Sequence, residues 1–233
     1  MRDDAHSFKL AGEVYWLVLF AFITLAMIYI FDLDFYFADL IYQPTKSWKY
    51  QDVWLTDILI HKYGKYTLIL LYLIFLFEFF VGNRKNEDRY KRYNKMILLV
   101  SLLLGAISVT LLKQVLEVDC PWDLSRYGGG ELFFPLFQYA SESLPSSHCF
   151  PSGHASTGFT WFSLYFYSCI YYPKYKLRIL VVTLFIGFLY GASQQFRGAH
   201  FISHDVWSML VCLTVNIVIY KLAFRSTAEI EKV

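Results

Sequence analysis

The chain has 233 residues, of which 57% are hydrophobic, 20% aromatic and only 17% charged. This composition is typical of an integral membrane protein, because soluble domains seldom carry so few charged residues. The formal net charge is +2, and the sequence has no basic patch, internal repeat or low-complexity tract that would indicate a nucleic-acid partner.

Six apolar segments approach the length of about 20 residues that a membrane-spanning helix needs. They are Gly12–Phe31, Tyr66–Val81, Met96–Leu116, Ala155–Tyr172, Ile179–Ser193 and Val206–Phe224. The second and fifth are short, so either could be a buried helix instead. The first is too long for a cleavable signal peptide and lacks a small-residue cleavage site, so we expect it to remain as an anchor. The sequence predicts an all-α membrane bundle of about six transmembrane helices, forming a single domain over residues 1–233.

Lysine and arginine predict the orientation, because short loops rich in these residues stay in the cytoplasm. They gather in residues 83–95, in residues 173–178 and at the C-terminal end. In a six-span arrangement these three regions share one side, so we expect both termini to be cytoplasmic. The segment 32–65 breaks the rule with four lysines on the outer side. Its apolar pattern from Phe35 to Tyr42 favours a helix lying at the membrane interface, with a solvated loop as the alternative.

The four cysteines divide by location. Cys169 and Cys212 lie in predicted spans and are expected to be inert apolar residues. Cys120 and Cys149 both fall in the loop 117–154, which faces outward. If that face is an oxidising space, the two could form a disulfide.

Three polar clusters occur at the predicted outer ends of spans. Lys113 lies one turn before the end of the third span, where a lysine can also simply extend to the interface. Pro151-Ser152-Gly153-His154 forms a turn before an apolar run, and amides at the start of a helix attract anions such as phosphate. The third cluster, residues 193–205, contains Arg197, His200, His204 and Asp205. Ionisable residues at membrane depth are usually functional.

These clusters resemble the motifs of the type 2 phosphatidic acid phosphatase (PAP2) superfamily. The family pattern is K-x6-R-P, then P-S-G-H, then S-R-x5-H-x3-D. Lys113 and Pro121 match the first motif, residues 151–154 match the second completely, and Ser193 and His200 match the third.

The departures from the family pattern concern phosphate binding. Cys120 and Gln194 stand where the family has arginines, and His204 stands where it has an acidic residue, with Asp205 one position later. Arg197 lies three residues before His200, so on a helix both would share a face. We expect Arg197 to replace one lost arginine, because its planar guanidinium binds phosphate oxygens in pairs. Arg126 is the weaker candidate for the other.

The resemblance implies a two-step reaction through a phosphohistidine. His200 would attack phosphorus, with His204 or Asp205 orienting its second ring nitrogen. His154 would protonate the leaving oxygen and later activate water. The phosphoryl oxygens would be held by Lys113, Arg197, Gln194, Ser152 and Gly153, with Arg126 as a further candidate. This scheme needs no metal and no cofactor.

Three other interpretations remain open from the sequence. A phosphotransferase would use the same phosphohistidine and pass the phosphate to another lipid. A metal-binding membrane protein is favoured by four histidines on one face, among which His200 and His204 have i, i+4 spacing. A member of the family that binds a lipid phosphate without turning it over is favoured by the three substitutions.

The expected substrate is a lipid phosphate whose tail stays in the bilayer. Aromatic residues around the turn, such as Phe133, Phe134 and Phe150, suit an amphiphile, although interface anchors have the same composition. Lipid A, phosphatidate, phosphatidylglycerophosphate and polyprenyl diphosphate all fit, and residue spacing does not choose among them. The expected location is a bacterial inner membrane, with the active site facing the periplasm.

Overall fold

The computed structural model describes residues 12–82, 88–116, 118–135 and 147–230, with side chains up to residue 224. The described residues are mostly helical, and their only β-type pairing is a single bridge between Leu124 and Glu131. The α-helices are α1 Gly12–Ile30, α2 Leu33–Tyr42, α3 Lys65–Val81, α4 Arg89–Val115, α5 Gly153–Phe159, α6 Phe162–Tyr171, α7 Lys176–Phe196 and α8 Ile202–Ile230. A π-helix, η1 (Trp54–Gly64), runs directly into α3, and short 3-10 turns are η2 (Pro121–Asp123), η3 (Ser125–Tyr127) and η4 (Pro173–Tyr175).

Five helical segments of the described chain are long and apolar enough to cross a membrane. They are Gly12–Ile30, Trp54–Val81, Arg89–Val115, Pro173–Phe196 and Ile202–Phe224. Many large apolar side chains on them remain exposed, for example Phe20, Phe77 and Phe185. Exposed apolar faces of this extent are expected of helices that contact lipid. The chain is therefore an all-α integral membrane protein.

The prediction of about six continuous spans is wrong in one place. The expected span Ala155–Tyr172 is divided into α5 and α6 at Thr160 and Trp161. At this break the backbone hydrogen bonds join residues three apart, as in a 3-10 helix. They run from Trp161 N to Gly158 O and from Ser163 N to Thr160 O. A Cβ on Gly158 would lie 2.5 Å from the backbone nitrogen of Gly187, so α5 packs directly on the backbone of α7. This close contact places α5 in the interior of the bundle.

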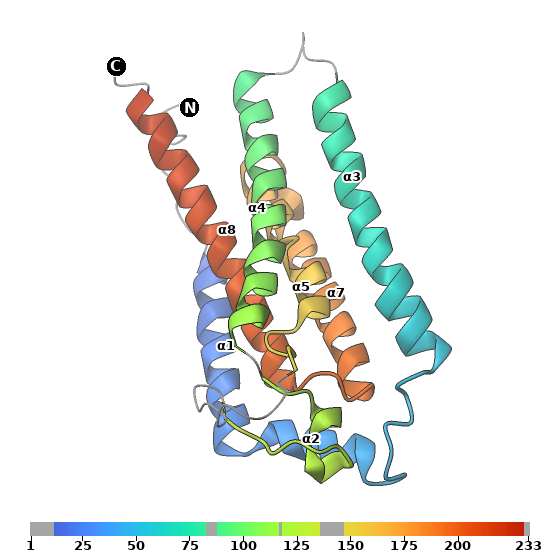
Figure 1. The fold of residues 1–233 in the computed structure, drawn as a ribbon. Coiled ribbons are helices and arrows are strands. Elements are labelled where there is room, and N and C mark those ends of the chain that lie inside the picture. Colours follow the sequence, from blue (N-terminus) through green and yellow to red (C-terminus); the bar gives the residue numbers. More distant parts are fainter. Residues whose placement is uncertain (1–11, 83–87, 117, 136–146, 231–233) are drawn as a thin grey trace.

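Two other boundaries differ from the expectation. The second span is lengthened by η1 and the third begins at Arg89, so basic residues expected in a loop belong to the first turns of α4. The helix expected near Phe35 is confirmed as α2, which lies across the lower end of the bundle in Figure 1.

The core is made by α5, α6 and α8, with α1 packed alongside. Its fully buried side chains include Phe159, Phe162, Tyr165, Phe166, Cys212, Leu213 and Tyr220. Four of the seven residues of α5 are buried, namely Ala155, Ser156, Gly158 and Phe159, and this packing explains why so short a helix is stable.

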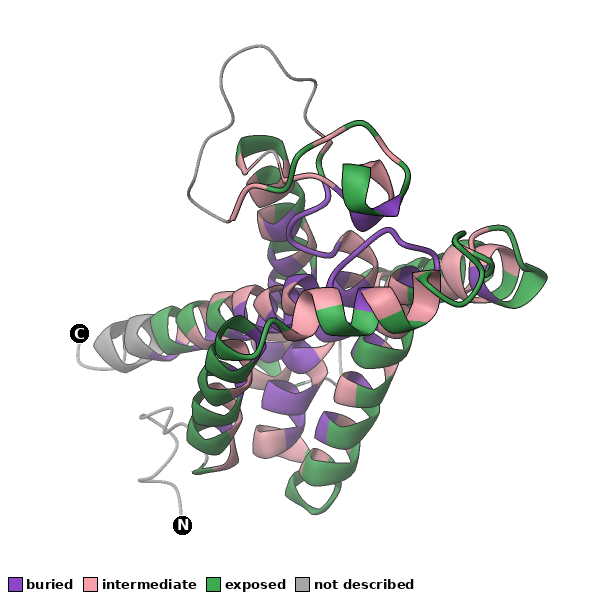
Figure 2. Ribbon diagram, turned by 90° about the horizontal axis from the view of Figure 1, so that it is seen from below, coloured by how far each residue is buried: buried purple, intermediate pink, exposed green. Residues whose placement is uncertain are grey.

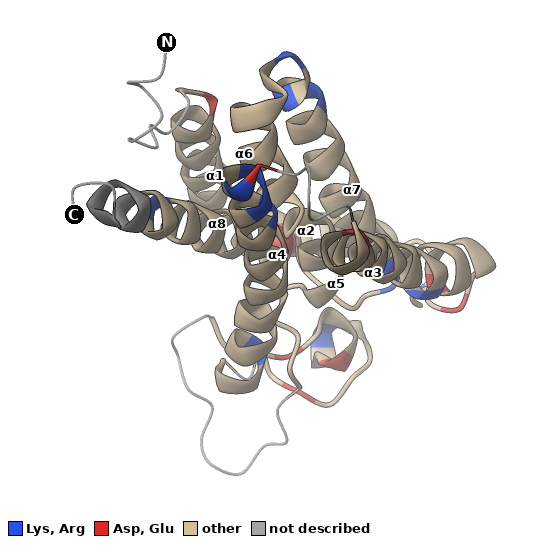
Figure 3. Cartoon of the chain, turned by 90° about the horizontal axis from the view of Figure 1, so that it is seen from above, with Lys and Arg blue, Asp and Glu red and all other residues tan. Residues whose placement is uncertain are grey.

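The two ends of the bundle differ in content. In Figure 1 the last turns of α8 and the start of α4 lie at the upper end, the first turn of α1 lies about midway, and α2 lies at the lower end. Seen from above, Figure 3 shows lysines and arginines at the start of α4 and at the turn leading into α7. The segments that carry the three motifs are at the opposite end.

Candidate active site

Three segments distant in sequence meet at the lower end of the bundle. They are the chain that follows α4, the turn before α5, and the loop between α7 and α8. Backbone hydrogen bonds join them, from Cys149 N to Val118 O (2.9 Å), from Trp122 N to Gly198 O (2.9 Å) and from Ser152 N to His204 O (3.2 Å). Figure 2, seen from below, shows buried coil segments in the centre of this end. The three sequence motifs therefore form one cluster.

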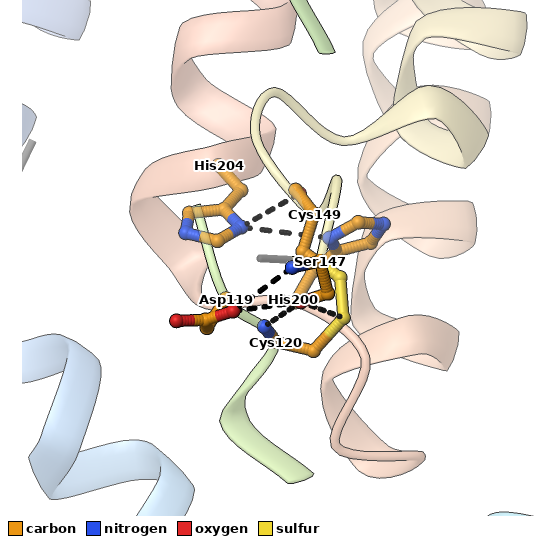
Figure 4. The surroundings of a disulfide bond; sticks show 6 residues. All are labelled: Asp119, Cys120, Ser147, Cys149, His200 and His204. Carbon is orange, nitrogen blue, oxygen red and sulfur yellow. Dashed lines mark hydrogen bonds between the residues drawn. A yellow bond between two sulfur atoms is a disulfide. The ribbon is translucent and has the colours of Figure 1, made fainter. Parts of the chain in front are cut away.

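A disulfide between Cys120 and Cys149 ties the first of these segments to the second. The prediction of this bridge is confirmed. Figure 4 shows it beside His200 and His204, with Ser147 accepting from the amide of Cys120 (3.0 Å) and Asp119 accepting from the amide of Ser147 (3.0 Å). Cys120 is thus a structural cysteine at the position where the family motif has an arginine.

The turn before α5 is fixed by Ser152. Its hydroxyl accepts from the amide of Ala155 (3.4 Å), and its carbonyl accepts from the hydroxyl of Ser208 (2.8 Å) on α8. Lys113, in the last turn of α4, points its ammonium toward this turn, since a Cβ placed on Gly153 would lie 3.7 Å from Lys113 Nζ. The first two motifs are therefore in contact.

His200 and His204 lie side by side. The two Nδ1 atoms are 3.5 Å apart, and Nδ1 of His204 is 3.0 Å from the carbonyl oxygen of Cys149. A carbonyl oxygen only accepts, so Nδ1 of His204 carries a proton. Because Nδ1 of His200 lies against His204, Nε2 is the ring nitrogen of His200 left for a substrate, and a nucleophilic imidazole needs a free electron pair on that atom.

The electrostatic surroundings of His200 keep its ring neutral. Burial lowers the pKa of His200 well below its usual value of 6.5, and the nearby His204, Lys113 and His154 lower the pKa further. The residue is 5% exposed. Lys113, His154 and His200 are therefore close enough to interact, although they come from three separate motifs.

Asp205 and Arg126 are engaged elsewhere. Asp205 accepts from the side-chain amide of Gln195 (2.5 Å), and it fills the space beside Gly191, where a Cβ would lie 2.2 Å from a carboxylate oxygen. Arg126 forms two hydrogen bonds with Asp39, the shorter of 2.6 Å, and lies over the ring of Phe35. Of the two candidates for orienting His200, only His204 contacts it in the hydrogen bonds described.

Arg197 does not share a helix with His200, so that part of the prediction is wrong. α7 ends at Phe196, and Gly198 takes a positive φ of 79° that reverses the chain. Glycine is favoured at this position because it has no Cβ to clash. The guanidinium of Arg197 nevertheless remains buried, and Nη1 lies 3.4 Å from Oε1 of Gln194. The amide nitrogen of Gln194 is buried without a partner among the described residues.

Two functional candidates were missed from the sequence, Asp57 and His61 in η1. Arg197 Nη2 lies 2.9 Å from Asp57, and Arg197 Nη1 lies 2.7 Å from His61 Nδ1. The ring of His61 is 4.2 Å from the ring of His154, centroid to centroid. The i, i+4 spacing of Asp57 and His61 was the signal that could have revealed them.

The described residues contain no group of three or more His, Cys, Asp or Glu side chains arranged as metal ligands. In the close pair of His200 and His204, Nδ1 of His204 donates to the carbonyl oxygen of Cys149 instead. The metal-binding interpretation therefore gains no ligand set from this part of the chain.

A family model described as the PAP2 superfamily matches residues 94–228, from the first turns of α4 to the last of α8. The match includes all three motifs and leaves α1, α2, η1 and α3 outside. Comparisons with curated proteins and with solved structures give no match. Because the family model covers more than half of the chain, this integral membrane protein belongs to the PAP2 superfamily.

Proposed function

We propose that the protein is a lipid phosphatase that removes a phosphate group through a phosphohistidine formed on His200. The observation that supports this most is the convergence of Lys113, His154 and a buried neutral His200 from three separate motifs. Membership of the PAP2 superfamily supports a phosphate ester as the substrate.

In the first step, the Nε2 electron pair of His200 attacks phosphorus and the bond from phosphorus to the leaving oxygen breaks. His154, which carries a second proton once the anionic phosphate is bound beside it, gives that proton to the leaving oxygen as general acid. In the second step, His154 takes a proton from water, the resulting hydroxide attacks phosphorus, and the bond from phosphorus to nitrogen breaks. Phosphate leaves, and both histidines return to their starting states.

Charge on the phosphoryl oxygens would be stabilised from several directions. Lys113 supplies an ammonium beside Gly153, and the backbone amide of Gly153 would be a further donor. The unpartnered amide nitrogen of Gln194 is a further donor at the position of a family arginine. Arg197 adds positive charge behind it. Fixed donors of this kind stabilise a transition state because they need no reorganisation during the reaction.

The orientation of His200 would come from the Cys149 carbonyl and His204, in place of the family's carboxylate. Cys149 is held by the disulfide, so its carbonyl is a fixed acceptor. A neutral acceptor stabilises a cationic imidazole less than a carboxylate does. We therefore expect a slower enzyme than one with the full family motif.

A cavity of about 640 Å³ beside the site supports an amphiphilic substrate. Its walls include Phe22 and Tyr29 of α1, Phe35 of α2, and Phe150, and it reaches His204. A lipid tail would fit among these side chains while its phosphate reaches the histidines. Because basic residues gather at the other end of the bundle, we propose that the site faces the non-cytoplasmic side, which is the periplasm in a bacterial inner membrane.

The test is phosphate release by the purified protein from a panel of lipid phosphates, with and without a chelator. We expect release that resists the chelator, and an acid-labile phosphoryl group on His200 when the reaction is stopped early. His200→Gln should release none. Failure of the wild-type protein to release phosphate from any panel member would favour a binding protein, and transfer of phosphate to an added lipid acceptor would favour a transferase.

A further inference from the structure

The guanidinium of Arg197 is almost fully committed to its neighbours. Nε donates to the carbonyl of Gln51 (2.8 Å), Nη1 faces both His61 and Gln194, and Nη2 pairs with Asp57. Arginine has five N–H groups, so these four contacts leave one. Arg197 is therefore better placed to hold other groups than to clamp a phosphate with its planar fork.

The contact between Arg197 and His61 fixes the hydrogen-bonding state of the imidazole. Arginine only donates, so Nδ1 of His61, 2.7 Å from Nη1, must present its electron pair. The proton of the neutral ring then lies on Nε2. Asp57 is 3.3 Å from the same Nδ1 but takes its hydrogen bond from Arg197 at 2.9 Å. His61 is thus a hydrogen-bond donor through Nε2, polarised by a guanidinium.

The position of η1 brings this donor to the site. Ser193 of α7 donates to the carbonyl of Thr56 (3.2 Å), and Gly64 packs against the ring of Tyr190. These contacts hold η1 on α7, and the imidazole of His61 lies against that of His154 at 4.2 Å. The side chain of His61 is 27% exposed, so its ring is open to a ligand at this end.

We propose that His61 is a further substrate-contacting residue, which donates a hydrogen bond from Nε2 to a phosphoryl oxygen of the lipid phosphate. It rests on the proposed function. His61 supplies the contact with the phosphoryl oxygen that the family arginine makes at the position of Gln194. Arg197 and Asp57 are positioning residues that act through His61. A neutral donor backed by a buried cation stabilises the charge that develops on the phosphoryl oxygens.

Three substitutions of His61 separate substrate contact from a structural role. In His61→Gln the amide nitrogen reaches the place of Nε2, so the donor to the substrate is kept. In His61→Asn the amide reaches only the place of Nδ1, so it preserves the contact with Arg197 and loses the donor to the substrate. His61→Ala loses both. We expect kcat/KM to fall about 10²-fold in the Ala and Asn variants and less than about tenfold in the Gln variant.

Tyr63→Phe, which removes one hydroxyl from an exposed ring on the same element, is the control and should match the wild type. Thermal stabilisation by inorganic vanadate gives a readout that needs no turnover, and it should weaken in the Ala and Asn variants. Rescue by Asn instead of Gln, or wild-type activity in His61→Ala, would overturn the inference while leaving the phosphatase intact. If the wild-type protein released no phosphate and vanadate did not stabilise it, the proposed function itself would fail.

Discussion

The Nδ1 atoms of His200 and His204 lie 3.5 Å apart, and Nδ1 of His204 lies 3.0 Å from the carbonyl oxygen of Cys149. His204 occupies the position of the family's acidic residue, but it is itself a donor to this carbonyl. It therefore holds the ring of His200 in place, but it does not take charge from the imidazole as a carboxylate would.

We predict that His204→Ala lowers kcat by about one to two orders of magnitude with little change in KM, because His204 orients the nucleophile without contacting the phosphoryl group. His204→Asn, whose amide nitrogen reaches the place of Nδ1, should recover part of the loss. Steady-state kinetics on one lipid phosphate would measure both. An equal loss in the two variants would show that the Nδ1 donor is unimportant.

Loss of the disulfide should affect both stability and activity. The bridge closes a loop of 29 residues, and a cross-link of that length stabilises a protein by about 3 to 4 kcal/mol. We predict a lower melting temperature for Cys120→Ser, and a lower kcat because the Cys149 carbonyl is no longer fixed. The measurement is thermal unfolding and phosphate release. Cys169→Ser, which removes a free cysteine, serves as the control.

The depressed pKa of His200 predicts a dependence of stability on pH. The ring stays neutral in the folded protein, whereas in the unfolded chain it binds a proton below its usual pKa of 6.5. The contribution of His200 to the free energy of unfolding is therefore fully present above pH 6.5. It is lost as the pH falls below that value, by about 1.4 kcal/mol per pH unit for this one group. Thermal unfolding between pH 7.5 and 5.5 should show a smaller loss in His200→Gln than in the wild type. Equal losses would mean that His200 is not buried in its neutral form.

The two candidate arginines should behave differently. Arg126 is paired with Asp39 at a half-exposed site, so Arg126→Ala should cost less than about 1 kcal/mol of stability and leave phosphate release unchanged. Arg197 is buried and holds η1 to the site, so Arg197→Ala should lower activity about 10²-fold. Parallel assays of the two variants would test this. A large loss in Arg126→Ala would return that residue to the site.

The sequence by itself determined the membrane class, most helix positions and the three motifs. Apolar segments long enough for a bilayer are local features, and the spacing from Lys113 to Pro121 and the Pro151–His154 tetrapeptide can be read without a fold. The pairing of Cys120 with Cys149 was also accessible, because both lie in one loop beside the motif.

Only the tertiary structure decided how these parts meet. Arg126 pairs with Asp39, which is 87 residues away in the sequence, and His61 contacts Arg197, which is 136 residues away. Such pairs depend on how helices pack, and nothing in the local sequence of either partner specifies the other. The break between α5 and α6 has the same origin, since the approach of Gly158 to Gly187 belongs to the contact between two helices.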